Sequence, residues 1–595
     1  PSTIYFDPSP SSGPLATVEG LTVDAGDIIV GDDGAWTKVA AGDAGKILAS
    51  NGAGSLPTWD RVARTATYVV AASDAPDHVK RQADYICDGI DDHEEIHAAI
   101  AALPENGGSI CLSPGTFNAS IRITKPNVHL FGTWATTIKT LDGIDTATNS
   151  NSATIRVFGD GCLIENLKFD GNLAGNPTLV GDFNACVRSD GIGIYANGCT
   201  VRNCWFVDTL GHSVIVWNEA DPLGIAAESA ARSYVTIEGN LFEGSGTKRA
   251  RIDVARESAS PDKINHHVII RNNQIKNVSG QSITIHAGSD IIISGNQIDN
   301  AGTGIYPHND LRNIVIAENV VTNITTDHGI RIISTASGAN NIMIVGNVVA
   351  TGADVGISIS GPTTAMIGHN RITGCKNGIH TTSYGGVHPN DLLIVGNTIE
   401  STTEEAIYVT GGARHAILAN RVDKSGYGAI RFGTVTDCTV KENIITNNGT
   451  LATRDAVYFP TPSRAVVEGN VIWGSTRDGV SFSGPAGADS TIRNNVISGC
   501  TGRSIKTTAA RTLIEGNACD AASIEILSAA VDSRISQNTL TSGASLIVAA
   551  SGAVVRGNGG FVTENAGVAA SVADGGTIAH GCAMTPTIAT VSGSV

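Results

Sequence analysis

The sequence is poor in charge, in aromatic side chains and in long apolar runs. Only 16% of its 595 residues are charged, 5% are aromatic and three are methionine. No apolar run reaches the roughly 18 residues of a membrane-spanning helix, so we expect no membrane insertion. The net charge is −17 and no basic run interrupts it, which argues against nucleic acid as the main partner.

Cysteine is present but not in a pattern that forms a known site. The eleven cysteines are scattered, their number is odd, and no two of them form a CxxC pair. This pattern indicates neither a disulfide framework nor a zinc site. We therefore predict no metal and no cofactor, and expect most of the thiols to be small buried hydrophobic groups.

What the sequence has in abundance is a repeat. The phrase aliphatic-x-x-Asn-x-aliphatic occurs as IVGNVV from Ile344 and as IVGNTI from Ile394. Its asparagine recurs at a common spacing of 23 residues, as from Asn273 to Asn296 and from there to Asn319. The full series is Asn240, Asn273, Asn296, Asn319, Asn347, Asn370, Asn397, Asn420, Asn443, Asn470, Asn495, Asn517, Asn538 and Asn558, and Cys204 takes the same place one turn earlier.

A second phrase, Gly or Ala followed by aliphatic-x-aliphatic, lies between successive asparagines, as in GISISG and AIYVTG. Each period therefore holds at least two short alternating strands. The period is too short for a strand-helix-strand unit of about 30 residues. The pattern predicts a coil of short strands stacked as parallel sheets, with the asparagine at a corner, where it tolerates a left-handed conformation and bonds along the axis.

With this repeat, the chain resembles the pectate-lyase-like superfamily of right-handed parallel β-helices. Residues 83–123, which include DGIDDHEEIHAAIAAL and GGSICLSPGTF, resemble its N-terminal cap. We predict an all-β, right-handed parallel β-helix over residues 131–560. It is preceded by an entry segment, 63–130, with a capping helix at about 92–103 that Asp92 caps and Glu95 completes as a capping box.

The two ends resemble bacteriophage modules. Within residues 1–62, GDIIVGDDGAWTKVAAGDAGKIL and PTWD resemble a short module of tail-fibre and tailspike proteins. Residues 561–595 are expected to form a short β segment, similar to the opening of a small domain at the end of phage β-helix proteins. The resemblance implies a homotrimer that attaches through its N-terminus to other phage tail or capsid proteins. PSTIYFDPSP lacks the features of a secretory signal, so we expect synthesis in the host cytoplasm and action outside the cell, in the virion tail.

Candidate site residues gather where three longer excursions, 172–189, 218–233 and 245–266, interrupt the early rungs. Polygalacturonases of this fold carry acidic and Gly-His-Gly motifs, of which only the fragments SDG, GHS and DHG occur. No convincing calcium cluster of the pectate-lyase type is present, although the resemblance leaves Ca²⁺ open. The candidate catalytic residues are Asp190, Asp208, His212 and Glu219, and the candidate substrate-binding residues are Arg249, Arg251, Arg256 and Trp217. His286, His308 and His380 are expected to face solvent.

An alternative carboxylate pair lies in the regular rungs. Asp455 and Asp478 are 23 residues apart in the repeats TRDA and TRDG. They should therefore stack about 5 Å apart, a separation that suits a retaining glycosidase. Charge pairing with the preceding arginines, Arg454 and Arg477, explains the same pattern without catalysis.

Three functions remain open on this sequence. The first is a phage tailspike or tail fibre that binds a host surface polysaccharide. The second is a polysaccharide-degrading hydrolase or lyase, and the third is a purely structural fibre or decoration protein.

Overall fold

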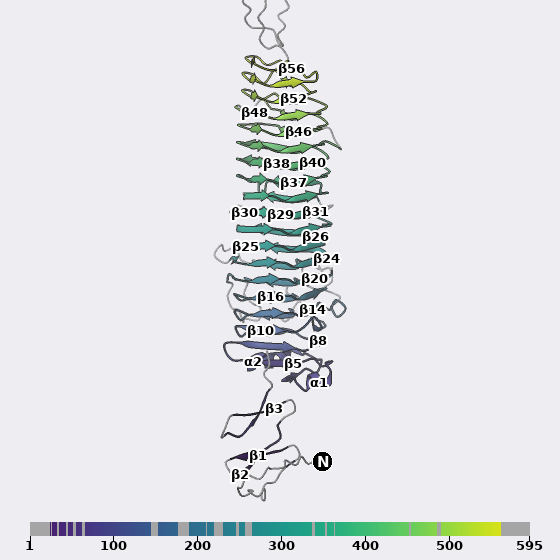
Figure 1. Cartoon of the computed structure of the whole chain (residues 1–595), viewed down its shortest axis with the longest axis vertical. Helices are drawn as coiled ribbons and strands as arrows, with labels where there is room; N and C mark the ends of the chain where they lie inside the picture. The colour runs from purple at the N-terminus through teal and green to yellow at the C-terminus, as the bar shows by residue number, and fades with distance from the viewer. Residues whose placement is uncertain are drawn as a thin grey trace, which may run out of the picture.

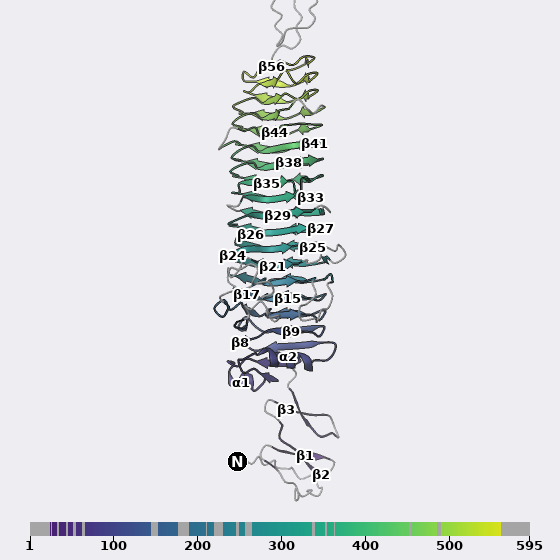
Figure 2. The ribbon, with the colours of Figure 1, turned by 180° about the vertical axis from the view of Figure 1, so that it is seen from behind.

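The structure is a computed structural model that describes residue 24 and residues 27–32, 35–42, 46–51, 55–61, 66–143, 153–176, 190–209, 211–218, 230–244, 249–255, 264–335, 339–350, 354–361, 363–450, 454–484 and 489–560. Its main body is a stack of short parallel strands (Figures 1 and 2). One rung contributes a strand to each of three columns, which we number in chain order from the strand before the recurrent asparagine. The predicted right-handed parallel β-helix is confirmed.

The first column forms one sheet. Its strands are β5 Tyr68–Ala71, β6 Tyr85–Ile86, β7 Gly108–Leu112, β10 Val128–Phe131, β13 Leu163–Glu165, β16 Thr200–Arg202, β19 Thr236–Glu238, β22 Asn265–His266, β23 Ile269–Arg271, β25 Gly288–Ser294, β27 Leu311–Ala317, β30 Ala339–Val345, β33 Thr363–Gly368, β36 Leu393–Val395, β39 Ala416–Leu418, β42 Thr439–Lys441, β45 Val466–Glu468, β48 Thr491–Arg493, β51 Leu513–Glu515, β54 Arg534–Ser536 and β57 Val554–Arg556.

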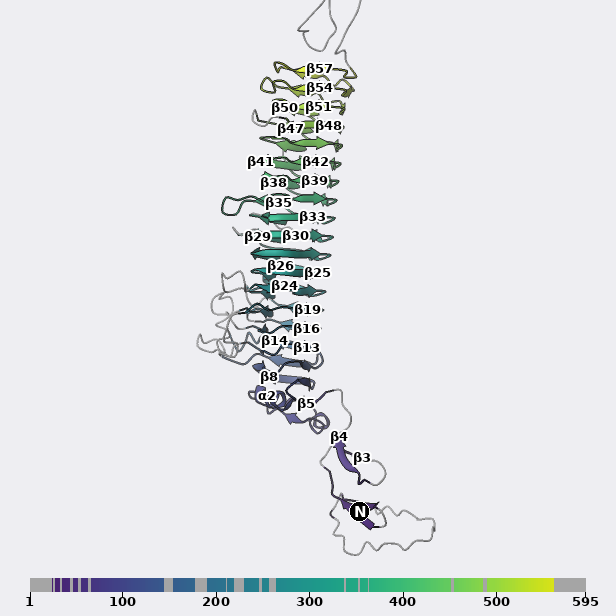
Figure 3. The same ribbon diagram turned by 90° about the vertical axis from the view of Figure 1, so that its left-hand side faces the viewer.

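The second and third columns share a 32-stranded sheet, because β24 Gln274–Ile285 and β26 Gln297–Asn309 run through both. The second column holds β8 Gly115–Asn118, β11 Thr136–Lys139, β14 Lys168–Asp170, β17 Trp205–Val207, β20 Leu241–Glu243, β28 Val320–Thr322, β31 Val348–Ala350, β34 Arg371–Thr373, β37 Thr398–Glu400, β40 Arg421–Asp423, β43 Ile444–Thr446, β46 Val471–Trp473, β49 Val496–Ser498, β52 Ala518–Asp520 and β55 Thr539–Thr541. The third holds β9 Ile121–Ile123, β12 Ile155–Val157, β15 Ile192–Ile194, β18 Val214–Val216, β21 Ile252–Val254, β29 His328–Ser334, β32 Val355–Ser360, β35 Asn377–Thr382, β38 Ile407–Ala413, β41 Ile430–Thr436, β44 Val457–Phe459, β47 Val480–Phe482, β50 Ile505–Thr507, β53 Ile524–Ile526 and β56 Leu546–Val548. Figure 3 shows first-column strands such as β33 at one edge and third-column strands such as β35 at the other.

One continuous core runs through the coil. Side chains alternate in and out along each strand, and the inward ones are almost all aliphatic. Aromatic rings stack where they occur, as in Phe169, Phe206 and Phe242, whose successive centroids lie 4.6 and 4.9 Å apart. The strand spacing of about 4.8 Å sets this contact, so equivalent residues on successive rungs pack directly on one another.

The predicted asparagine ladder is present. The backbone N–H of Asn347 donates to Oδ1 of Asn370 on the next rung, and its Nδ2 donates to the same oxygen and to the carbonyl of Ile316, each at 2.9 Å. The N–H of Cys204 donates to Oδ1 of Asn240, so this cysteine holds the first place of the ladder. These bonds satisfy backbone groups that the corner buries.

One detail of the corner differs from the prediction. The left-handed conformation belongs to the residue before the ladder asparagine, as at Gly346 (φ 65°), Glu318 (φ 56°) and His369 (φ 54°). The asparagine itself does not have a positive φ. Its amide must point into the coil to bond along the axis, so the preceding residue makes the turn.

The capping helix is α2, His93–Ala102, which packs on β5, β6 and β9 through buried Ile96, Ala99 and Ile100. A shorter helix, α1, spans Asp77–Lys80. The side chain of Asp92 does not cap α2, contrary to the expectation. Its carboxylate accepts hydrogen bonds from the backbone N–H groups of Gly89 (2.8 Å) and Asn118 (2.7 Å), which tie the helix start to the first rung.

Two antiparallel hairpins lie in the N-terminal segment, β1 Ile28–Asp32 with β2 Ala35–Val39 and β3 Lys46–Ala49 with β4 Thr58–Arg61. The predicted segment 561–595 lies outside the described residues, so the domain boundaries stay predictions. Neither helix in the described part of the chain has the length and hydrophobicity needed to cross a membrane.

Candidate functional site

The outer face of the third column carries aromatic and charged side chains in register. Strand pairing stacks Arg331, Ser358, His380, Tyr408, Arg431 and Tyr458 on successive rungs from β29 to β44. The strands that carry them follow one another along the stack (Figure 2). All six residues point away from the core because their strand neighbours point into it. We call this face the groove face.

The larger of two depressions on the groove face has a volume of about 340 Å³. In its lining the His380 ring stacks on Tyr408, with centroids 5.0 Å apart and an angle of 5° between the rings. Burial, with His328 nearby, lowers the pKa of His380 to about 4, so the ring is neutral at pH 7. The lining residues are His328, Arg331, Asp354, Val355, Ser358, Ser360, Lys376, Asn377, His380, Thr382, Glu404 and Tyr408.

A smaller depression of about 90 Å³ lies further along the groove face. Arg431 is positioned next to both depressions, since its guanidinium lies 5.0 Å from the Tyr408 ring centroid and its Nη1 lies 2.9 Å from Oε1 of Glu405. The lining residues are Glu405, Gly428, Arg431, Arg454, Asp455, Tyr458 and Arg477. Guanidinium groups stacked on tyrosine keep a fixed orientation.

Asp455 and Asp478 occupy equivalent places on adjacent rungs, as their spacing indicates. The backbone N–H of Asp478 donates to Oδ1 of Asp455 at 3.2 Å. Nε of Arg477 lies 3.2 Å from Oδ1 of Asp455 and 3.9 Å from Oδ2 of Asp478. Burial raises the pKa of Asp455, and Asp478 adds to this while Arg477 opposes it. Both carboxylates are buried, and the guanidinium is the more exposed group of the cluster. Their predicted catalytic role stays a prediction.

A second polar cluster lies on the outward side of the third column's early rungs. His212 is bound on both sides: Nδ1 lies 2.9 Å from Oδ1 of Asp190, and Nε2 lies 3.2 Å from Oδ2 of Asp253. Nε2 of His286 lies 3.3 Å from the same Asp253 oxygen. The three residues Asp190, His212 and Asp253 are all buried. The imidazole fills the space between the two carboxylates, where a glycosidase would place water or a sugar.

The charges in this cluster follow from these contacts. Burial lowers the pKa of His212, but its two carboxylate partners outweigh burial and raise it to about 9. The pKa of Asp253 is held below its usual range despite burial, because His286 and His212 flank it. The pKa of His286 is raised by Asp253, against the effect of burial. His212 is therefore an imidazolium that donates from both nitrogens.

The structure places the remaining predicted site residues separately. Asp208 is a turn residue with φ of 50°, and no hydrogen bond or ion pair joins it to Asp190 or His212 among the described residues. Trp217 is buried, and its indole N–H donates to Oδ2 of Asp190 at 3.3 Å. Arg251 is fully buried, and its Nη1 donates to the Thr209 hydroxyl at 2.9 Å.

Arg249 is half-buried, whereas Glu219 and Arg256 lie outside the described residues, as do most of the three excursions. The expectation for His286, His308 and His380 was wrong in part. All three are half-buried, and the His286 and His308 rings lie 4.4 Å apart. Burial, together with His286, lowers the pKa of His308 to about 4.

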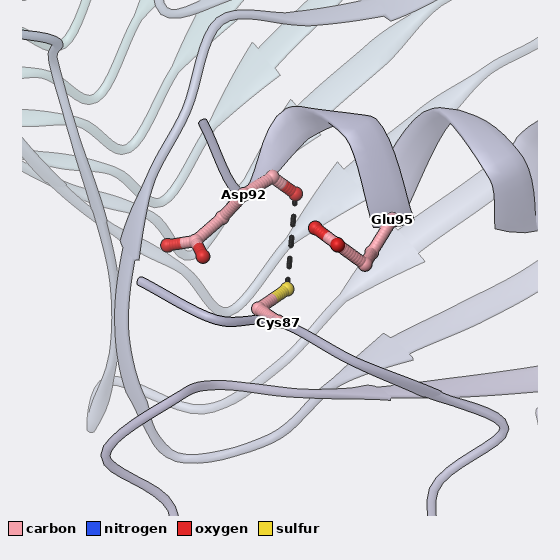
Figure 4. Close-up of side chains that lie close together, drawn as sticks. All are labelled: Cys87, Asp92 and Glu95. Carbon is pink, nitrogen blue, oxygen red and sulfur yellow. Dashed lines mark hydrogen bonds between the residues drawn. The ribbon is translucent and has the colours of Figure 1, made fainter. Parts of the chain in front are cut away.

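One group of potential metal ligands occurs in the described residues, at the start of α2. Ligand atoms of Cys87, Asp92 and Glu95 lie within 4.8 Å of one another (Figure 4). Burial raises the pKa of the Cys87 thiol well above its usual range, with Asp92 and Glu95 adding to the effect. The thiol stays protonated and donates to the Asp92 carbonyl. A protonated thiol is a poor metal ligand, so this group is suited to anchoring the cap.

The parallel columns and the asparagine ladder define a right-handed parallel β-helix protein. A family model described as "Right handed beta helix region" matches residues 387–558, and the model of the periplasmic copper-binding protein NosD matches residues 224–393. A search of curated proteins finds no match.

Solved structures with a similar coil come from several kinds of protein. The mannuronan C-5 epimerase A-module of Azotobacter vinelandii is 16% identical, with 72% of this chain and 97% of that chain covered and a TM-score of 0.36. A tailspike protein mutant of E. coli bacteriophage HK620, in complex with a pentasaccharide, is 14% identical, with 79% and 84% covered and a TM-score of 0.46. The surface adhesin PfbA of Streptococcus pneumoniae is 17% identical, with 70% and 90% covered and a TM-score of 0.29.

Proposed function

We propose that this chain is the receptor-binding protein of a bacteriophage tail, a tailspike or tail fibre, and that its groove face binds a host surface polysaccharide. The observation that carries the proposal is the His380–Tyr408 ring stack in the larger depression, flanked by Arg331 and Arg431. Aromatic faces pack on the apolar faces of sugar rings, and the surrounding polar groups bind hydroxyls. The phage assignment is supported by the N-terminal sequence module.

The polysaccharide test compares variants of two tyrosines. Tyr408→Ala removes the platform of the larger depression, whereas Tyr234→Ala removes a tyrosine that is 63% exposed and lies outside the groove lining. We expect Tyr408→Ala to weaken binding of host capsule or lipopolysaccharide about tenfold, as the loss of one aromatic contact predicts. Tyr234→Ala should bind as the wild type does. Equal binding by all three proteins in calorimetry would contradict the proposal.

A polysaccharide hydrolase or lyase is the second candidate, and the stacked Asp455 and Asp478 beside the smaller depression favour it. Incubation with the bound polysaccharide, followed by assays for new reducing ends and for unsaturated products, separates a binder from a hydrolase and from a lyase. Release of neither product would exclude the enzymatic function.

The proposed homotrimer has a candidate contact surface on the first column. On the first-column strands β25, β27, β30, β33, β36 and β39, the last two outward positions are almost entirely apolar. Ile292 and Met343 are each 41% exposed. Ion pairs lie on both sides of this stretch, Arg271 with Glu238 and Arg493 with Glu468. A row of partly exposed apolar side chains of this kind supports contact with further copies of the chain. Its apolar members are Ile292, Val315, Ala317, Met343, Val345, Met366, Leu393, Val395, Ala416 and Leu418.

A further inference from the structure

Three arginines surround the smaller depression of the groove face: Arg431, Arg454 and Arg477. The carboxylates beside them are buried, whereas the guanidiniums reach solvent. The side chains of Arg431 and Arg477 are 32% and 42% exposed, while those of their partners Glu405 and Asp455 are 5% and 2% exposed. The surface that a ligand meets at this depression is therefore cationic, although the carboxylates beneath it are anionic.

The buried carboxylates fix the arginines without using all their donors. Glu405 takes one bond from Nη1 of Arg431, and Nε of Arg431 has no hydrogen-bond partner among the described residues. Asp455 lies 3.2 Å from Nε of Arg477, and the side chain of Arg477 is 42% exposed. A guanidinium carries five N–H donors, so each of these arginines can bind a second oxyanion.

Arg454 is the least engaged of the three. It is exposed, its guanidinium lies 5.6 Å from the Tyr427 ring centroid, and it forms no ion pair with any carboxylate in the described part of the chain. The tyrosine contact orients the group without neutralising it. An unpaired arginine beside two oriented ones favours binding of a planar or tetrahedral anion.

The size of the depression limits what it can hold. Its volume of about 90 Å³ equals that of roughly three water molecules, which suits a charged substituent but not a sugar ring. The neighbouring depression, at about 340 Å³, has room for a ring. Arg431 lines the smaller depression and its guanidinium lies over Tyr408, which lines the larger one, so a ring in the larger depression can direct its substituent toward the arginines.

We infer that the smaller depression is an oxyanion subsite, and that the polysaccharide of the proposed function is anionic, with a carboxylate, sulfate or phosphate group bound by Arg431, Arg454 and Arg477. This inference rests on the proposed function of the groove face. The net charge of −17 repels a polyanion at long range, and the three guanidiniums supply the local attraction that overcomes it.

The test uses an array of purified capsular and lipopolysaccharide polysaccharides, some neutral and some acidic, probed with the full chain. We expect binding to acidic members and a loss of about tenfold or more for Arg454→Gln, the range for a hydrogen bond to a charged group. Arg454→Lys keeps the positive charge but loses the paired N–H donors of the guanidinium, so its loss of binding affinity should be smaller than that of Arg454→Gln. The control is Arg421→Gln, an exposed arginine of the second column outside the depression.

Chemical treatment of a bound polysaccharide identifies the anion. If the bound anion is a carboxylate, reduction of the carboxyl groups of the polysaccharide should abolish binding. If it is a sulfate or phosphate ester, desulfation or dephosphorylation should abolish binding. Binding to neutral members alone would overturn the inference and leave the proposed function intact, as would equal binding of acidic members by Arg454→Gln and the wild type. Binding to no polysaccharide would overturn both.

Discussion

Nε2 of His212 lies 3.2 Å from Oδ2 of Asp253, which belongs to the next rung of the third column. The other ring nitrogen faces Asp190, so one imidazolium links two buried carboxylates. Removing one partner of such a group leaves an uncompensated buried charge, which costs about 3–5 kcal/mol. The irregular early rungs, whose loops interrupt the periodic packing, are thus held together by charge.

This link predicts a loss of stability in mild alkali. The pKa of His212 is raised from 6.5 to about 9 in the folded protein, so its contribution is complete below pH 6.5 and disappears as the pH rises to about 9. The difference corresponds to about 3 kcal/mol. We expect the thermal unfolding midpoint of the wild type to fall over this range.

The matched variant is His212→Gln, which should unfold earlier at pH 6 and show a shallower pH dependence. Some dependence should remain, because the pKa of His286 is also raised beside Asp253. If His212→Gln keeps the full pH dependence of the unfolding midpoint between pH 6.5 and 9, His212 is not the source of that dependence.

The asparagine ladder predicts a position-dependent cost of mutation. Asn347→Ala removes the acceptor of two bonds from Asn319 and the donor of bonds to Asn370 and Ile316. At about 1–3 kcal/mol for each buried group left without a partner, we expect a loss of about 2–6 kcal/mol in the free energy of unfolding.

The control for the ladder is its last described member, Asn558, which accepts two bonds from Asn538 and donates to the Ile535 carbonyl, but donates to no further asparagine among the described residues. Asn558→Ala should cost less than Asn347→Ala, measured by guanidinium denaturation. An equal cost at both positions would show that the bonds to the next asparagine add nothing to stability.

The repeat made the coil predictable because its residues act locally and identically on each rung. The regular spacing of Asn347 and Asn370 is enough to predict the corner of each rung. The same spacing places Asp455 and Asp478 on adjacent rungs. The left-handed residue was missed because glycine, glutamate and histidine all occupy it, at Gly346, Glu318 and His369. That position has no single residue type to reveal it.

The site was harder to predict because its contacts cross irregular rungs. His212, Asp253 and His286 are separated by loops of unequal length, so no fixed spacing connects them. The His380–Tyr408 stack was detectable in principle, since both residues take the outward place in the phrases GIHTT and AIYVT. The stack can be predicted only if the outward residues of successive repeats are aligned as one column on the surface.

The apolar stretch of the first column predicts the effect of a charge at its centre. Met343 is 41% exposed and lies next to Met366 on the adjacent strand. If copies of the chain meet there, Met343→Glu places a charge in the contact and should convert the trimer to monomers, measured by light scattering. Thr439→Glu, on the same face but beyond the apolar stretch, should remain associated. A wild-type protein that is monomeric at micromolar concentration would contradict the proposed assembly.

The buried pair on the groove face predicts that the charge of Asp455 is dispensable. Burial raises its folded pKa above 3.8, so its ionised form costs stability as the pH rises through that folded value. Asp455→Asn removes this cost at pH 7 and keeps an oxygen that can accept the N–H of Asp478. The exposed Arg477 that loses its partner remains solvated. We therefore expect Asp455→Asn to be as stable as the wild type or more so, and to bind polysaccharide equally well.

Asp455→Ala is the informative companion, since it also removes the acceptor. Leaving the N–H of Asp478 without that oxygen should cost about 1–3 kcal/mol in unfolding experiments. The same two variants test the enzymatic alternative. If Asp455 is catalytic, both variant proteins should release no product from the polysaccharide. Retained product release by Asp455→Asn would exclude this carboxylate as a catalytic group.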